Sequence, residues 1–172
     1  MQKENYWIEG PWPGRLAIAP RPRGGDWLED EVRSWRKTGL DIVVSLLTSD
    51  EVTDLDLTHE AEYCQANGIQ FITFPIIDRG VPILRNITFD FVRKLDKSLA
   101  DGNTIVIHCR QGIGRSALIA ACLLVLSGLD PEHAFQSVST ARGSTVPETT
   151  EQREWVLTFS RSLTEIDPKN SQ

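Results

Sequence analysis

The sequence predicts an α/β fold, a single domain in which helices flank a mostly parallel central sheet. Apolar runs of strand length alternate with helical patterns along the chain. With 172 residues, 40% of them hydrophobic, the chain can bury one ordinary core without a second domain. Neither an internal repeat nor a low-complexity linker interrupts the alternation. Sheets of this kind bind ligands beyond the carboxyl ends of their strands.

The first half of the chain contains three predicted strands and two predicted helices. RLAIA at 15–19 is a short strand, and the turn-forming PRPRGG after it leads into a helical pattern at 26–37. The strongly apolar DIVVSLLT at 41–48 is the second strand. A helical stretch at 57–66 ends at an Asn-Gly pair, and IQFITFPI at 69–76 is the third strand.

The second half contains one more strand and four predicted helices. Residues 89–99 form an amphipathic helix, and NTIVIHC at 103–109 is a buried strand. The apolar helix at 115–126 ends before a glycine. Two further helices are expected at 131–140 and 149–163. Strands separated by helices pair in parallel, which predicts helices on both faces of the sheet.

Charge and cysteine usage restrict the classes of function. A net charge of −6 and a pI of about 5.1 do not suit a nucleic-acid or anionic-membrane binder. Three widely spaced cysteines indicate reduced thiols rather than a disulfide framework or a zinc cluster, so we expect no metal and no cofactor. The N-terminal residues lack the apolar run of a signal peptide, and the longest apolar run is too short to cross a bilayer. We therefore expect a cytoplasmic protein without a nucleic-acid or membrane partner.

The stretch HCRQGIGRSA connects the strand at 103–109 to the helix at 115–126. Its glycines match a dinucleotide fingerprint in spacing, but a predicted helix follows where that motif requires a second parallel strand. A Walker A motif is excluded because no Gly-Lys-Ser/Thr is present. The remaining interpretation is a phosphate cradle that contains a nucleophile, Cys109. The glycines let the loop curl, so that successive backbone N–H groups of the cradle would point inward at an anion. The cradle consists of Arg110, Gln111, Gly112, Ile113, Gly114 and Arg115.

The helix that starts near Arg115 contributes the positive end of its dipole to this cradle. The Arg115 guanidinium can bind two phosphate oxygens in a fork. The same positive environment favours the thiolate form of Cys109.

These residues resemble the signature of the cysteine-dependent protein phosphatases: His-Cys, five residues, Arg, then Ser or Thr. The matching residues are His108, Cys109, Arg115 and Ser116. The resemblance implies that Cys109 attacks phosphorus to give a phosphocysteine, that Arg115 binds phosphoryl oxygens, and that Ser116 assists the departing thiolate. His108 would be structural and hold the loop.

A leaving alkoxide or phenoxide needs a proton, so the mechanism requires a carboxylic acid on a neighbouring loop. Asp78 is the candidate, because it follows the strand at 69–76 and resembles the general acid of small dual-specificity phosphatases. Asp-Arg-Gly could also be an ordinary turn. Four other carboxylates are expected to be solvated in a polar loop after SLLT: Asp50, Glu51, Asp54 and Asp56.

The segment from Glu148 to Gln152 resembles the family's water-positioning loop, in which Gln-Thr, two residues and a second Gln open a late helix. Glu148 replaces the first glutamine, so the sequence leaves open whether Glu148 or Gln152 handles water. Thr149 and Gln152 also fit a capping box, and the two interpretations are compatible.

The resemblance extends from about Trp12 to Trp155 and implies one dual-specificity-phosphatase-like catalytic domain over 1–172, with a core at about 12–163. Near the N-terminus, Trp7, Trp12 and Trp27 are expected in aromatic packing. No segment resembles the long substrate-recognition loop of large tyrosine-specific enzymes. The pocket should therefore be shallow and accept phosphoserine and phosphothreonine as well as phosphotyrosine, in a phosphoprotein or phosphopeptide substrate.

Two alternatives remain open at this point. An inositol phosphate or phosphoinositide phosphatase would use the same chemistry, although such enzymes usually place lysines around the nucleophile. A noncatalytic phosphopeptide-binding module could keep the cradle without turnover. The sequence indicates neither the physiological substrate nor the oligomeric state.

Overall fold

The computed structural model describes residues 4–166, and the expected domain range of 1–172 extends beyond them at both ends. Its centre is a five-stranded sheet with the order β1-β2-β5-β3-β4, in which β1 is antiparallel to β2 and every other pair is parallel. The strands are β1 (Tyr6–Ile8), β2 (Arg15–Pro20), β3 (Ile42–Ser45), β4 (Gln70–Thr73) and β5 (Thr104–Cys109). The predicted α/β fold with a mostly parallel sheet is confirmed.

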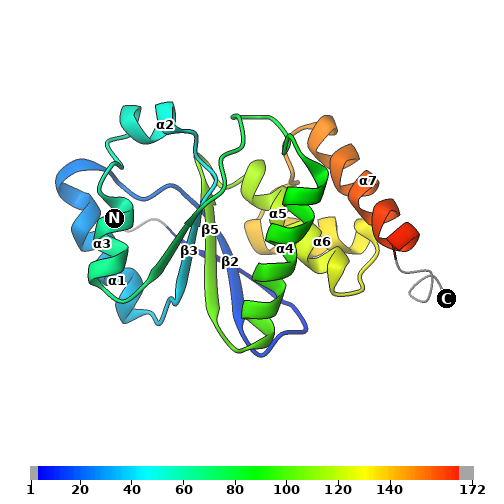
Figure 1. Cartoon of the computed structure of the whole chain (residues 1–172), viewed down its shortest axis with the longest axis horizontal. Coiled ribbons are helices and arrows are strands. Elements are labelled where there is room, and N and C mark those ends of the chain that lie inside the picture. Colours follow the sequence, from blue (N-terminus) through cyan, green and yellow to red (C-terminus); the bar gives the residue numbers. More distant parts are fainter. Residues whose placement is uncertain (1–3, 167–172) are drawn as a thin grey trace.

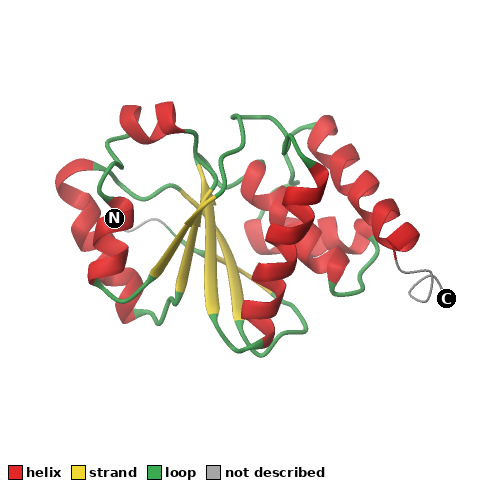
Figure 2. Ribbon diagram, viewed as in Figure 1, coloured by secondary structure: helices red, strands yellow, loops and turns green. Residues whose placement is uncertain are grey.

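Helices cover both faces of this sheet (Figures 1 and 2). One face carries α1 (Leu28–Lys37), preceded by the short 3-10 turn η1 (Gly25–Trp27), and α3 (Glu60–Ala66), while α2 (Ser49–Asp54) lies at the carboxyl end of the strands. The other face carries α4 (Arg85–Ala100), α5 (Arg115–Leu126), α6 (Pro131–Arg142) and α7 (Thr150–Ile166).

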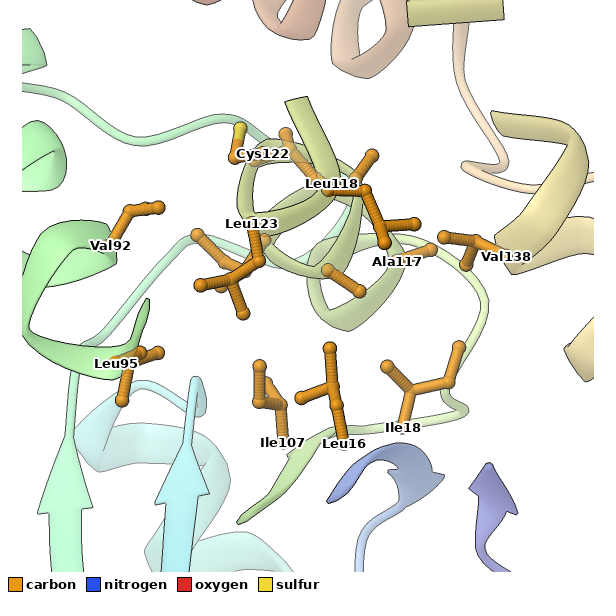
Figure 3. Packing of buried hydrophobic residues seen from close by; sticks show 14 of the residues in the cluster. Leu16, Ile18, Val92, Leu95, Ile107, Ala117, Leu118, Cys122, Leu123 and Val138 are labelled. Carbon is orange, nitrogen blue, oxygen red and sulfur yellow. The ribbon is translucent and has the colours of Figure 1, made fainter. Parts of the chain in front are cut away.

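The strands divide their side chains between two apolar cores because successive residues point to opposite faces. Val43 and Val106 pack with α1 and α3, whereas Val44 and Ile107 pack with the α4–α7 layer. From Ala117 to Val125, α5 is apolar all round and buried, so this part of the helix forms the centre of the larger core. Figure 3 shows Leu118 and Leu123 of α5 with side chains from the sheet, α4 and α6 around them.

All four predicted strands are present, and the helix predicted at 115–126 has those bounds. Two elements were not predicted. β1 has three residues, too few for a period-two pattern to be visible. α2 occupies the segment expected to be a polar loop, and a capping box between Thr48 and Glu51 starts it.

The expected aromatic packing of the N-terminal tryptophans holds only in part. Trp12 packs against the larger core and donates Nε1–H to Asp96 at 2.8 Å. The Arg15 guanidinium lies 3.9 Å from the ring centroid of Trp7, a cation–π contact. For Trp27 the expectation is wrong, because its ring is 58% exposed and contacts the guanidinium of Arg23.

The parallel register aligns the carboxyl ends of the central strands. Pro20 pairs with Cys109, and Ser45 pairs with His108, so the loops that follow β2, β5 and β3 leave the sheet at one level. Within residues 4–166, no helix is long and apolar enough to cross a membrane.

Candidate active site

The loop between β5 and α5 is shaped by close backbone contacts. Cys109 is the last residue of β5 and is 3% exposed. Gly112 has a φ of +72°, and a Cβ built on it would lie 2.8 Å from the carbonyl carbon of Ala19. Only glycine fits this position, since any side chain would meet the backbone at the end of β2.

α5 begins at Arg115 without a side-chain cap at Gly114. Its first N–H groups are therefore available to an anion in the loop. Ser116 places Oγ 3.2 Å from the Sγ of Cys109, close enough to donate a hydrogen bond to a thiolate.

The Arg115 side chain is 1% exposed and is held by four oxygen-bearing groups, one of which is the Leu46 carbonyl at 3.5 Å from Nη1. Nη1 donates to Glu51 at 2.6 Å and to the Ile76 carbonyl at 2.8 Å. Nη2 donates to the second oxygen of Glu51 at 2.9 Å and to Asp78 Oδ1 at 3.1 Å. The pair with Glu51 is bidentate, which fixes the plane of the guanidinium.

The expectation that Glu51 belongs to a solvated surface is wrong. Its side chain is 10% exposed and faces Arg115, while Asp50, Asp54 and Asp56 are exposed as predicted. The Thr-x-x-Glu capping pattern at 48–51 could have revealed α2. The contact with Arg115 joins residues far apart in the sequence, so no local pattern reports it.

The Glu51–Arg115 pair changes the pKa of both groups. Burial alone would raise the pKa of Glu51, but hydrogen bonds from Arg115 and the Thr48 backbone, with the attraction of the guanidinium, hold it below its usual value. Burial alone would lower the pKa of Arg115, but hydrogen bonds to Glu51 and the negative charges of Cys109, Glu51 and Asp78 raise it. Both groups therefore stay charged at neutral pH.

Asp78 lies in the loop after β4, with a side chain that is 49% exposed. It borders a small pocket of about 70 Å³ above Cys109. The pocket is lined by Asp78, Arg79, Cys109, Arg110, Gln111, Ile113, Gly114, Arg115 and Glu148. The structure thus brings together a thiol, a guanidinium and a carboxyl group. The thiol of Cys109 and the guanidinium of Arg115 come from one loop, whereas the carboxyl group of Asp78 comes from a position 31 residues before Cys109.

Glu148 and Gln152 occupy different places. Glu148 lines the pocket, and its carboxylate lies 3.8 Å from Arg79 Nη1. Gln152 is fully buried, and its Nε2 donates to the Gly80 carbonyl at 3.1 Å. Reciprocal hydrogen bonds join Thr149 and Gln152, which confirms the predicted capping box.

A family model described as "Polymorphic toxin system, DSP-PTPase phosphatase" matches residues 18–129, which run from the second half of β2 to just beyond α5 and include the whole Cys109 loop. The chain belongs to the DSP-PTPase family. The resemblance to cysteine-dependent phosphatases is therefore confirmed.

Curated relatives of this DSP-PTPase include cyclin-dependent kinase inhibitor 3 of Rattus norvegicus, 27% identical over 138 residues, which are 79% of this chain and 65% of that protein. A protein of Invertebrate iridescent virus 6 that carries the name tyrosine phosphatase 197R is 31% identical over 148 residues, which are 82% of this chain and 52% of that protein. The chain spans less than two thirds of the length of these relatives.

Solved structures share the fold over nearly the whole chain. A kinase associated phosphatase with serine in place of its catalytic-site cysteine is 22% identical, with a TM-score of 0.88 over 95% of this chain and 97% of that one. The active form of Tk-PTP is 25% identical, with a TM-score of 0.76 over 91% and 96% of the two chains.

Two contacts of the DSP-PTPase loop were not predicted from the sequence. His108, predicted to be structural, points away from the pocket, and its Nε2 lies 2.6 Å from Glu60 in a pair that is almost fully buried. On the outer side of the loop, Arg142 donates from Nε to the Gly112 carbonyl at 3.0 Å and from Nη2 to the Gln111 carbonyl at 3.4 Å. With its carbonyls bound outside, the loop keeps its N–H groups for the pocket.

Proposed function

We propose that the chain is a protein phosphatase that hydrolyses phosphate monoesters through a phosphocysteine intermediate. The observation that carries this proposal is the pocket in which Cys109, Arg115 and Asp78 meet at the end of β5 and the start of α5. Each of the three supplies one requirement of phosphoryl transfer: a nucleophile, a clamp for the phosphoryl oxygens, and a proton.

In the first step, the Cys109 thiolate attacks phosphorus as the bond from phosphorus to the ester oxygen breaks. Asp78 transfers its proton to the departing oxygen. Arg115 and the N–H groups of residues 110–115 bind the equatorial oxygens, where charge is spread in the transition state. Glu51 holds the guanidinium in one plane, so little reorganisation is needed during the reaction.

In the second step, water attacks the phosphocysteine, the phosphorus–sulfur bond breaks, and inorganic phosphate leaves. Ser116 donates its hydroxyl hydrogen to the departing thiolate. The sequence leaves Gln152 and Glu148 as the two candidates that position this water. The positive charges of the loop and Arg115 supply what a metal ion would otherwise provide, so the reaction needs no metal.

The substrate class follows from the size and charge of the pocket. A small pocket open to solvent suits a phosphorylated side chain of a protein, phosphotyrosine and also phosphoserine or phosphothreonine. The two further cations in its lining each face a carboxylate at 3.8 Å, Arg79 with Glu148 and Arg110 with Glu51. The loop between Cys109 and Arg115 carries one base, Arg110, which argues against an inositol polyphosphate with its several additional phosphates. A cytoplasmic location stays a prediction.

Hydrolysis of 4-nitrophenyl phosphate in the presence of a chelator tests the activity and its independence of metal. A panel of phosphotyrosine, phosphoserine and inositol phosphate substrates then tests the class. Cys109→Ser should abolish turnover and keep phosphopeptide binding, because a serine hydroxyl is not ionised while the cradle persists. Turnover by Cys109→Ser at the wild-type rate would contradict the nucleophile, and binding without hydrolysis by the wild type would indicate a noncatalytic module.

A further inference from the structure

The segment between α6 and α7 places a carboxylate in the phosphate pocket. Glu148 lines the pocket together with Cys109, and its Oε1 would lie 2.7 Å from a Cβ built on Gly114. Its side chain is 21% exposed, so it is in reach of both the pocket and solvent. A water molecule in the pocket would therefore meet this carboxylate beside the phosphate loop.

Gln152 is already engaged elsewhere. Its Nε2 donates to the Gly80 carbonyl at 3.1 Å, and its side-chain oxygen accepts from the Thr149 N–H at 3.3 Å. Gln152 is fully buried and does not line the pocket, although its Nε2 and Oε1 also lie beside the loop, 3.0 and 3.2 Å from a Cβ built on Gly114. To orient a water at Cys109, its amide would have to give up contacts that start α7 and hold the Asp78 loop.

Asp78 also has a competing partner once it has lost its proton. Its Oδ1 accepts a hydrogen bond from Arg115 Nη2 at 3.1 Å, and the ionised carboxylate is attracted to that guanidinium. Glu148 has a weaker competitor, because Arg79 lies 3.8 Å away and is 69% exposed. Of the two carboxylates in the pocket, Asp78 is hydrogen-bonded through Oδ1 to the guanidinium that binds phosphate, whereas Glu148 faces only the exposed Arg79.

We propose that Glu148 is the general base of the second step, an inference that rests on the phosphatase function proposed above. As the water oxygen forms its bond to phosphorus, one water proton passes to a carboxylate oxygen of Glu148. The phosphorus–sulfur bond breaks, and its electron pair returns to Cys109 as the thiolate. Glu148 then releases the proton to solvent through its exposed edge.

This assignment separates the two steps kinetically. Phenol release ends the first step, and kcat/KM reports only the events up to that release. Glu148→Gln should therefore lower kcat by about 10²-fold and lower KM in parallel, leaving kcat/KM nearly unchanged. A merely structural role for Glu148 would lower kcat/KM as well.

The test is rapid mixing with 4-nitrophenyl phosphate on the full chain. Glu148→Gln should show a burst of one phenol per enzyme followed by slow turnover, with phosphate on Cys109 detected by mass spectrometry after acid quench. The matched control is Glu151→Gln, the same charge change at an exposed site in the first turn of α7, and it should show no burst. Glu148→Ala should regain turnover when formate is added as an external base.

A Glu148→Gln enzyme without a burst, or with kcat within about twofold of the wild type, would overturn the assignment. A burst in Gln152→Ala of equal size would overturn it too, because a general disturbance of the loop would then explain both. If instead the proposed phosphatase function were wrong, the wild-type chain itself would release no phenol, which distinguishes this outcome from a wrong assignment of Glu148.

Discussion

Replacing Glu51 by glutamine tests whether the buried pair with Arg115 holds the site together. Glutamine keeps the volume and one oxygen acceptor, so the variant loses one of the two charge-assisted hydrogen bonds seen at 2.6 and 2.9 Å. Such a bond contributes about 1.5–3 kcal/mol. The loss should stay below the roughly 3–5 kcal/mol of stranding a buried charge, because Ile76 and Asp78 still accept from Arg115.

The assays are urea unfolding and inhibition of the phosphatase by inorganic phosphate. We expect the free energy of unfolding to fall by about 1.5–3 kcal/mol. A guanidinium that is held less firmly in its plane should also weaken phosphate inhibition and lower kcat/KM by about 10²-fold. Asp50→Asn is the matched control, since Asp50 is an exposed acid in the same first turn of α2. If Glu51→Gln and Asp50→Asn agree in stability to within about 0.5 kcal/mol and in phosphate inhibition, the pair does not organise the site.

The pH dependence gives a second measurement on the same variant. The pKa of Glu51 is lower in the folded protein than its usual 4.5. The ionised Glu51 carboxylate therefore contributes to stability in full above pH 4.5, and this contribution is lost as the pH falls through the lower pKa of the folded protein. The stability gap between wild type and Glu51→Gln should therefore be full at neutral pH and close in acid. A gap that stays constant down to acid pH would contradict the ion pair as its cause.

Two further predictions concern Asp78 and the cysteines. Asp78→Asn should lower kcat by about 10²–10⁴ for phenyl phosphate and much less for 4-nitrophenyl phosphate, because only the poorer leaving group needs the proton; equal losses on both substrates would remove Asp78 from the role of acid. Peroxide should oxidise Cys109 first and thiol should reverse it, since burial, with Glu60 nearby, raises the pKa of Cys64 to about 12 and burial raises that of Cys122 well above its usual value. First oxidation at Cys64 or Cys122, located by mass spectrometry, would contradict this order.

The sequence predicted those parts of the molecule whose determinants are local. The four longer strands and α5 follow from apolar runs and their period, and the Cys109 loop follows from spacing within ten residues. The position of Asp78 near the Cys109 loop could be predicted because parallel strands place the loops that follow them at one end of the sheet. Local sequence was sufficient where neighbouring residues act together or where the topology is regular.

Contacts between distant segments were not accessible in this way. Glu51 approaches Arg115 from α2, Glu60 approaches His108 from α3, and Arg142 approaches the Cys109 loop from α6. In each case a buried polar group requires a hydrogen-bond partner, but the sequence does not indicate which residue supplies it. The sequence left the choice between Glu148 and Gln152 open for a finer reason. They lie on either side of the start of α7, and only the backbone path decides which of them faces the pocket.

The pairing of charges at the site bears on how an acidic protein can bind phosphate. With a net charge of −6, the long-range field of the chain repels anions. Arg115, Arg79 and Arg110 do not reverse that field, because each has a carboxylate within 4 Å. Binding energy must therefore come from short-range hydrogen bonds of the loop N–H groups and the oriented Arg115 guanidinium. Such bonds depend on the tetrahedral arrangement of phosphate oxygens, so the site selects its ligand by geometry rather than by charge alone.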